Sequence, residues 1–292
     1  MARRAFPIGA ALVAVGVALL TLGTLAAVGL RAGGFSPAAA DWAAVRFTVA
    51  QAAVSSACSV VLAVPVARAL ARRRFAGRGA LIVLMGAPFL LPVMVAVIGL
   101  LAVFGRSGLF NQGLVWLGLP PMSIFGFHGV ILAHLFLNLP LAVRMLLQGW
   151  QAIPAERFRL ARSLGFGPRA MFRHLEGPML RANVPGAAVV IFLVCLTSFA
   201  VVLTLGGGPR ATNVELAIYQ AVRFEFDLGR AAGLAGVQFA LCAAAVGLAG
   251  WMTIPTGFGA GLDRVPDVVA PAGWRRSRSS ASAPPPGSGR TW

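Results

Sequence analysis

QGWQAIPAERFRLARSLGFGPRAMFRHLEGP, residues 148–178, is a polar, arginine-rich stretch that lies between two long apolar runs. A basic segment between two membrane-spanning runs is either an anchor that fixes the topology or a docking element for a soluble partner. Composition alone does not decide between the two. The internal pattern of helix starts and stops favours docking.

That pattern predicts two short helices at a sharp angle on the membrane surface. Pro154 and Glu156 suit the start of a helix. The N–H that proline lacks is not needed there, and the negative charge of Glu156 is favoured by the helix dipole. Gly165 is typical of the residue that follows a helix C-terminus. A second helix is expected over residues 168–174, and Pro178 is expected to end it before the next apolar run.

The whole composition is that of a polytopic membrane protein. The chain has 292 residues, of which 58% are hydrophobic and 11% are charged, and its mean hydropathy is +0.83. An ordinary soluble domain has roughly 25% charged residues. The net charge of +17 does not indicate nucleic-acid binding, because the arginines cluster in short segments between apolar runs.

Six apolar runs are long enough to cross a bilayer as helices, which need about 20 residues each. The predicted fold is therefore all-α, with six transmembrane helices. The first run is about 23 residues long, which exceeds the apolar core of a signal peptide and favours an uncleaved span. The runs cover residues 7–30, 47–70, 80–104, 125–147, 184–205 and 230–251.

Arginine is unevenly distributed between the two sets of connections, and this predicts the orientation. The ends and loops at residues 3–4, 72–78 and 157–181 are rich in arginine, so they are expected in the cytoplasm, with both termini inside. The predicted organisation is a first span with its outer loop (1–45), a core of five spans (46–252) and a disordered tail (253–292). The tail is rich in Gly, Pro, Ser and Arg and has too little apolar surface to fold.

Polar residues inside the spans are candidates for a translocation path. Gln51 and Ser55 share one helix face, as do His134 and Asn138. Hydrogen bonding between packed spans would explain such residues equally well. The candidates for the path are Gln51, Ser55, His134, Asn138, Thr197 and Ser198.

Enzymatic motifs are missing from the sequence. It contains no P-loop, no HExxH and no nucleophile motif, so we expect no catalytic residue, no metal and no cofactor.

The loop resembles that of ABC-importer permeases. Their pattern is Glu-Ala-Ala, three residues, Gly, nine residues and Ile-x-Leu-Pro. Ala161, Gly165 and Pro178 match it, and Leu175 stands in place of isoleucine. The resemblance implies a type I ABC importer permease fold, in which this loop inserts a coupling helix into a groove of a cytoplasmic ATPase.

Two positions depart from that pattern. Arg159 replaces the acidic residue and Gly177 replaces leucine, so no role that depends on the acid can be carried over. Within a coupling loop at 148–182, the residues expected to dock the ATPase are Glu156, Arg159, Ala161, Arg162, Leu164, Gly165 and Pro178.

A second resemblance concerns residues 197–238. TSFAVVLTLGGGP, ELAIYQ and FEFDLGRAA, which begin at Thr197, Glu215 and Phe224, look like the first half of thiamine-importer permeases. This implies an inner-membrane permease for thiamine or its phosphates. The implied partners are an ABC ATPase dimer, a periplasmic solute-binding protein, a second permease half or second copy, and the lipid bilayer.

Three alternatives stay open. A permease for ferric iron or another small solute would share the pattern. A secondary transporter would need inverted repeats and ion-coupling residues, and the spans carry almost no acidic residue. The third alternative is a non-transporting fragment, because thiamine-importer permeases usually carry two six-span halves and this sequence shows only one. The change in composition motivates the hypothesis of a truncation or frameshift near Arg276.

Overall fold

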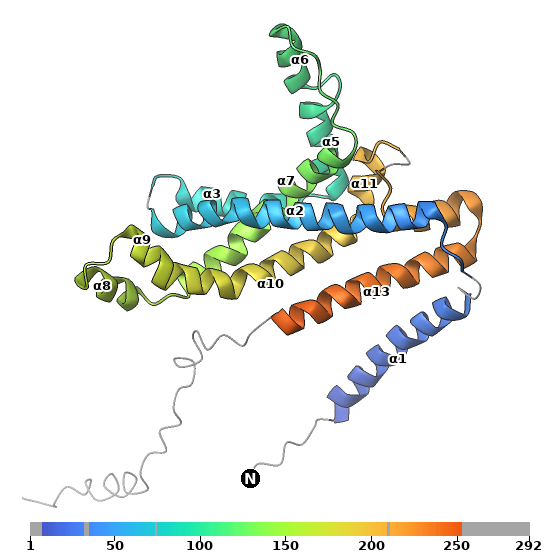
Figure 1. The fold of residues 1–292 in the computed structure, drawn as a ribbon, viewed down its shortest axis with the longest axis horizontal. Helices are drawn as coiled ribbons and strands as arrows, with labels where there is room; N and C mark the ends of the chain where they lie inside the picture. The colour runs from blue at the N-terminus through green and yellow to red at the C-terminus, as the bar shows by residue number, and fades with distance from the viewer. Residues whose placement is uncertain (1–7, 32–34, 74, 209–210, 253–292) are drawn as a thin grey trace, which may run out of the picture. The chain divides into compact units, whose positions relative to one another are not determined.

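The computed structural model describes residues 8–31, 35–73, 75–208 and 211–252, and every regular element among them is a helix (Figure 1). The predicted tail at 253–292 and the hypothesised change near Arg276 lie outside these residues. The helices are α1 (Ile8–Arg31), α2 (Ala39–Arg72), α3 (Arg78–Leu84), α4 (Ala87–Leu90), α5 (Val93–Phe104), α6 (Leu109–Trp116), α7 (Phe127–Gln151), α8 (Ala155–Ser163), α9 (Pro168–Met171), α10 (Gly177–Leu196), α11 (Phe199–Leu205), α12 (Val214–Gln220) and α13 (Leu228–Met252), with π-helical turns η1 (Phe172–Glu176) and η3 (Ala221–Glu225).

Five stretches of the described chain are long and apolar enough to cross a membrane. This confirms the prediction of an all-helical protein with several spans. Helix α1 lies where the first span is predicted, but the total of six spans and the orientation stay predictions. The five stretches are Ala39–Arg72, Val93–Trp116, Phe127–Gln151, Pro168–Leu196 and Leu228–Gly250.

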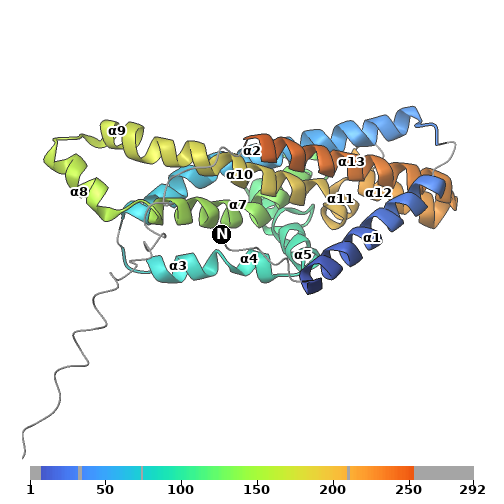
Figure 2. The same ribbon diagram turned by 90° about the horizontal axis from the view of Figure 1, so that it is seen from below.

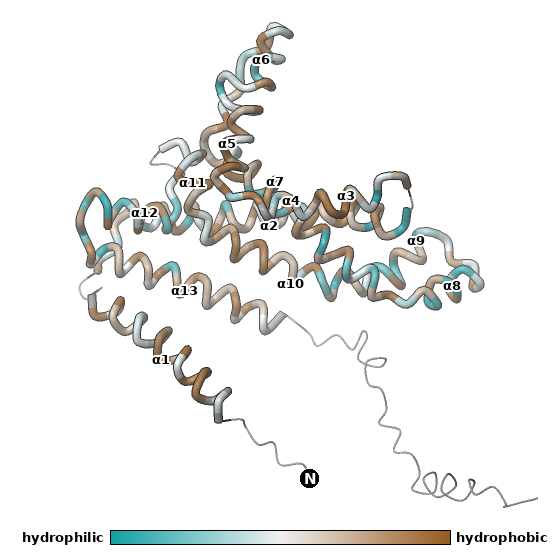
Figure 3. The backbone as a smooth tube through the Cα atoms, turned by 180° about the vertical axis from the view of Figure 1, so that it is seen from behind, coloured by the Kyte–Doolittle hydropathy of each residue, from teal (hydrophilic) through white to brown (hydrophobic). Residues whose placement is uncertain are grey.

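Helices α2, α7 and α10 pack side by side and form the largest apolar core (Figures 1 and 2). Helix α2 contributes Ala52, Ala63 and Ala67, which are completely buried. Small side chains let helix backbones approach closely, which is the main source of packing energy between spans in lipid. Helix α13 packs against α1, α10 and α12, and its Cys242 and Ala245 contact the main core. In Figure 3 the tube is apolar along α5 and α10 and hydrophilic at α8.

The third span differs from its prediction. Residues 80–104 do not form one helix but α3, α4 and the whole of α5, with interruptions at residues 85–86 and 91–92. Pro88 lies in the first turn of α4, and Pro92 is the residue before α5. Proline lacks an N–H and is therefore accepted where a helix begins, so each proline starts a new helix here.

The prediction that Pro178 ends a helix is wrong. The helix that begins at Pro168 continues through Pro178 to Leu196. Pro178 follows η1, a wider turn in which the Gly177 N–H donates to the Phe172 carbonyl. Such a π-turn shifts the hydrogen-bond register and accommodates the missing donor of Pro178. The helix of the fifth span also ends earlier than predicted, because it is interrupted at residues 197–198 before α11 begins.

Candidate functional site

His134 of α7 lies at the centre of a buried polar network. Its Nδ1 is 3.1 Å from Ser55 Oγ on α2, and its Nε2 is 2.5 Å from Ser198 Oγ in the break between α10 and α11. His134 is only 2% exposed. The side chain therefore joins three segments that are far apart in the sequence, at a depth where buried polar groups must find partners inside the protein.

The break between α10 and α11 leaves backbone carbonyls without helical partners, and three side-chain amides satisfy them. Gln51 Nε2 donates to the Cys195 carbonyl at 2.8 Å. Gln238 Nε2 donates to the Leu196 carbonyl at 3.0 Å, and Asn213 Nδ2 donates to the Ser198 carbonyl at 3.1 Å. The three amides come from three different segments. An interruption of a span is tolerated where other parts of the protein satisfy the freed groups, as they do here.

A cavity of about 440 Å³ opens at this break. Four of the predicted path residues line it: His134, Asn138, Thr197 and Ser198. Among the described residues that line it, the others are apolar and none is acidic. A largely apolar cavity with a few converging polar groups is the usual form of a small-molecule site.

The other two predicted path residues lie behind the cavity wall. Gln51 is completely buried and bonds to backbone carbonyls, and Ser55 supports His134. The Thr197 hydroxyl donates to the Leu193 carbonyl of the preceding helix, α10, at 3.3 Å. The sequence reasoning missed Gln238, although a lone carboxamide in the apolar run at 230–251 is itself a signal.

The loop after α7 forms a helix with a regular C-terminal cap. Two backbone bonds close the end of α8: Phe166 N–H donates to the Ala161 carbonyl at 2.9 Å, and Gly165 N–H donates to the Arg162 carbonyl at 3.0 Å. This pair of bonds is a Schellman motif, which requires a left-handed residue after the helix. Gly165 has a φ of +73° and supplies it.

The predicted docking residues fall on two sides of α8. Ala161 is buried and Phe158 packs against the main core, so this side attaches the helix. The outward residues form an exposed surface with both charged and apolar groups. It comprises Glu156, Arg159, Arg162, Leu164 and Gly165, together with Leu160, which the sequence reasoning did not include. Pro178 is half-buried in α10 and lies outside this surface.

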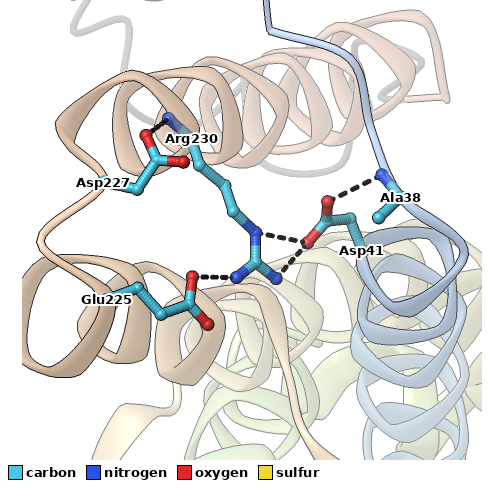
Figure 4. A network of polar contacts seen from close by, with 5 residues as sticks. All are labelled: Ala38, Asp41, Glu225, Asp227 and Arg230. Atoms are coloured by element: carbon cyan, nitrogen blue, oxygen red, sulfur yellow. Dashed lines mark hydrogen bonds and ion pairs between the residues drawn. The ribbon is translucent and has the colours of Figure 1, made fainter.

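A charged cluster lies at the start of α2 (Figure 4). Asp41 in the first turn of α2 is 2% exposed, and its Oδ1 accepts bonds from Arg230 Nη2 at 2.6 Å and Nε at 3.1 Å. Arg230 also pairs with Glu225, and Asp41 Oδ2 accepts from the Ala38 N–H at 2.9 Å. The cluster ties the start of α2 to the start of α13.

Apolar helices around an interrupted span, with buried polar groups and an exposed loop helix, are typical of helical membrane transport proteins. Comparison with known proteins agrees. No protein-family model matches the chain. It is 46% identical over 243 residues to a thiamine transport system permease protein of Brucella abortus (strain 2308), covering 80% of this chain and 45% of that protein. The corresponding protein of Escherichia coli (strain K12) is 48% identical over 206 residues, covering 69% and 38%.

A molybdenum transport system permease protein of Azotobacter vinelandii is 32% identical over 198 residues, covering 67% of this chain and 87% of that protein. Among solved structures, a chain of a bacterial alginate ABC transporter, in complex with an alginate-bound periplasmic protein, matches with a TM-score of 0.73 at 14% identity, covering 86% of this chain and 95% of that chain. This likeness supports the fold alone.

The chain belongs to the family of transport system permease proteins, and its fold matches that of a chain of an ABC transporter. It is accordingly a multi-pass protein of the inner membrane. The chain spans less than half the length of the thiamine permeases that it matches.

Proposed function

We propose that the chain is a membrane-embedded subunit of an ATP-driven importer and that it forms part of the path for thiamine or its phosphates. The observation that carries the proposal is the 46% identity to a thiamine transport permease over 243 residues. The cavity at the α10–α11 break supports it, because only four polar side chains, none of them acidic, lie among the apolar residues that line it. Such a wall holds a solute weakly, as passage requires.

We further propose that the exposed surface of α8 docks a separate cytoplasmic ATPase, which performs the hydrolysis, and that a periplasmic binding protein delivers the solute. Both termini would then lie in the cytoplasm. Leu160 and Leu164 are 61% and 64% exposed, which suits burial against a protein partner. We also propose that the chain pairs with a second permease half or a second copy, since it covers less than half the length of the thiamine permeases that it matches.

Uptake by the source organism tests the proposal with all natural partners present. Deletion of the gene is expected to abolish uptake of labelled thiamine at low concentration, and the intact chain supplied in trans is expected to restore it. Gly165→Arg is expected to insert normally but not to restore uptake. Unchanged thiamine uptake in the deletion strain would contradict the proposed substrate.

A molybdenum-containing oxyanion is the second candidate solute, because the molybdenum permease relative is matched over 87% of its own length. Labelled molybdate uptake in the same deletion strain separates the two. Loss of molybdate uptake with normal thiamine uptake would favour this second candidate.

A further inference from the structure

Glu176 is a completely buried carboxylate at the end of the bundle near α8, in the turn η1 that leads into α10. Two arginines of α2, one helical turn apart, hold it. Arg68 Nε is 2.6 Å from Glu176 Oε2, and Arg72 Nη1 is 3.2 Å from Glu176 Oε1. A buried carboxylate is stable only when its charge is paired, so these contacts fix η1 to α2.

Both arginines also stack on aromatic rings. The Arg68 guanidinium lies 5.2 Å from the ring centre of Phe172 in η1. The Arg72 guanidinium lies 4.9 Å from the ring centre of Phe158 in α8, and its Nη2 is 3.1 Å from Met171 Sδ in α9. A planar guanidinium can accept a ring on its face while its edge binds a carboxylate, and a lysine ammonium cannot do both.

Arg72 is thus in contact with α8, α9 and η1 at once, from its position on α2. Helix α8 makes no extensive packing with any one of the other described helices. Its attachment depends on a few side chains, chiefly Phe158 and Ala161. The contact between the Phe158 ring and Arg72 is therefore the point at which a displacement of α8 would act on α2.

We propose that Arg72, supported by Arg68 and Glu176, is the positioning residue that transmits movement of α8 to α2 and α10. The inference rests on the proposed function, because it takes α8 to be the element moved by an ATPase. On α2 the movement reaches Ser55, and on α10 it reaches the break at Ser198. Both residues bond to His134, so the linkage ends at the candidate site.

The test compares conservative variants in the full complex, purified with its ATPase and reconstituted in lipid vesicles with the binding protein and thiamine. Arg72→Lys keeps the charge and loses the planar stack. Phe158→Leu keeps an apolar side chain and loses the ring. Arg73→Lys is the matched control, because Arg73 belongs to none of the contacts that hold Glu176.

Arg72→Lys and Phe158→Leu are expected to assemble in normal amounts and to keep basal ATP hydrolysis. The stimulation of hydrolysis by loaded binding protein should fall by about fivefold or more in each, which is the usual size of a coupling between sites. Stimulation in the double variant should be no lower than in the more impaired single variant, because both substitutions remove the same contact between Arg72 and Phe158. Arg73→Lys should behave as wild type.

Normal stimulation in both variants overturns the linkage. A loss of assembled complex, with normal stimulation per complex, also overturns it and makes the cluster a structural anchor. If the wild-type complex itself shows neither uptake nor stimulation by thiamine-loaded binding protein, the proposed function fails and the linkage with it. The wild-type measurement therefore separates the two kinds of failure.

Discussion

Gly165 constrains the end of α8 through its backbone conformation and not through a lack of room for a side chain. A Cβ at this position would have no neighbour within 4 Å, but the φ of +73° is unfavourable for most residues. Gly165→Asn should retain most of the uptake, because Asn tolerates this conformation, whereas Gly165→Val should cost about 1–2 kcal/mol at the end of α8 and reduce uptake strongly. Labelled-thiamine uptake, corrected for the amount of protein in the membrane, checks this. Equal uptake by both variants would contradict it.

His134 is expected to matter more than any other residue that lines the cavity. Replacement by Ala leaves the hydroxyls of Ser55 and Ser198 without this partner. Two lost hydrogen bonds of about 1 kcal/mol each correspond to a loss of uptake of about tenfold or more. Thr197→Val is the control, because among the described residues that hydroxyl bonds only to carbonyls of the preceding helix, α10. A similar effect of the two substitutions on the uptake rate would argue against a central role for His134.

At the scale of the elements, Gly233 lets the segment before α2 reach α13. A Cβ on Gly233 would lie 2.2 Å from Cγ of Phe35, a ring that packs on the small core around Ala44, Val214 and Leu234. Gly233→Ala should therefore displace the ring and cost about 1–3 kcal/mol. Gly236→Ala, on the same helix with open space around it, should be neutral or slightly stabilising. Thermal unfolding of the purified protein measures both, and equal midpoints would refute the close contact.

The elements also show which features could be predicted from the sequence. The long apolar runs, the cap at Gly165 and the shared helix face of His134 and Asn138 follow from local rules, because periodicity and glycine act within one helix. The break at Thr197–Ser198 could not be predicted in this way. No proline or glycine lies between residues 187 and 205, and the amides that stabilise the break come from Gln51, Asn213 and Gln238 on distant segments.

Pro178 illustrates the opposite error. Local rules treat proline as a helix end, but the π-turn before it lets the helix continue, and Glu176 in that turn is stabilised by arginines of α2. Sequence reasoning used Arg72 only as a marker of orientation. Its contacts with Phe158, Met171 and Glu176 depend on how three separate segments pack, which a pattern within one segment cannot reveal.

At the scale of the whole bundle, the cluster around Arg230 joins the first core helix to the last. Arg230→Leu leaves the buried carboxylate of Asp41 without its cation and should lower the free energy of unfolding by about 3 kcal/mol. The double variant Asp41→Asn with Arg230→Leu should recover part of this loss, because no unpaired charge is then buried. Thermal unfolding of the three proteins provides the comparison. A double variant less stable than Arg230→Leu would show that the buried charge is not the cause.

Helix α2 has 34 residues and is therefore about 51 Å long, well beyond the roughly 30 Å of a bilayer's hydrocarbon core. Asp41 is paired near one of its ends and Arg72 near the other, and Ser55 bonds to His134 between them. Ser55 lies about 21 Å along the axis from Asp41 and about 26 Å from Arg72. Helix α2 is in this respect a two-armed lever with nearly equal arms. A tilt about the Ser55–His134 contact would therefore move the two ends of α2 in opposite directions by similar distances, so that a displacement at Arg72 would be matched by an opposite one at Asp41.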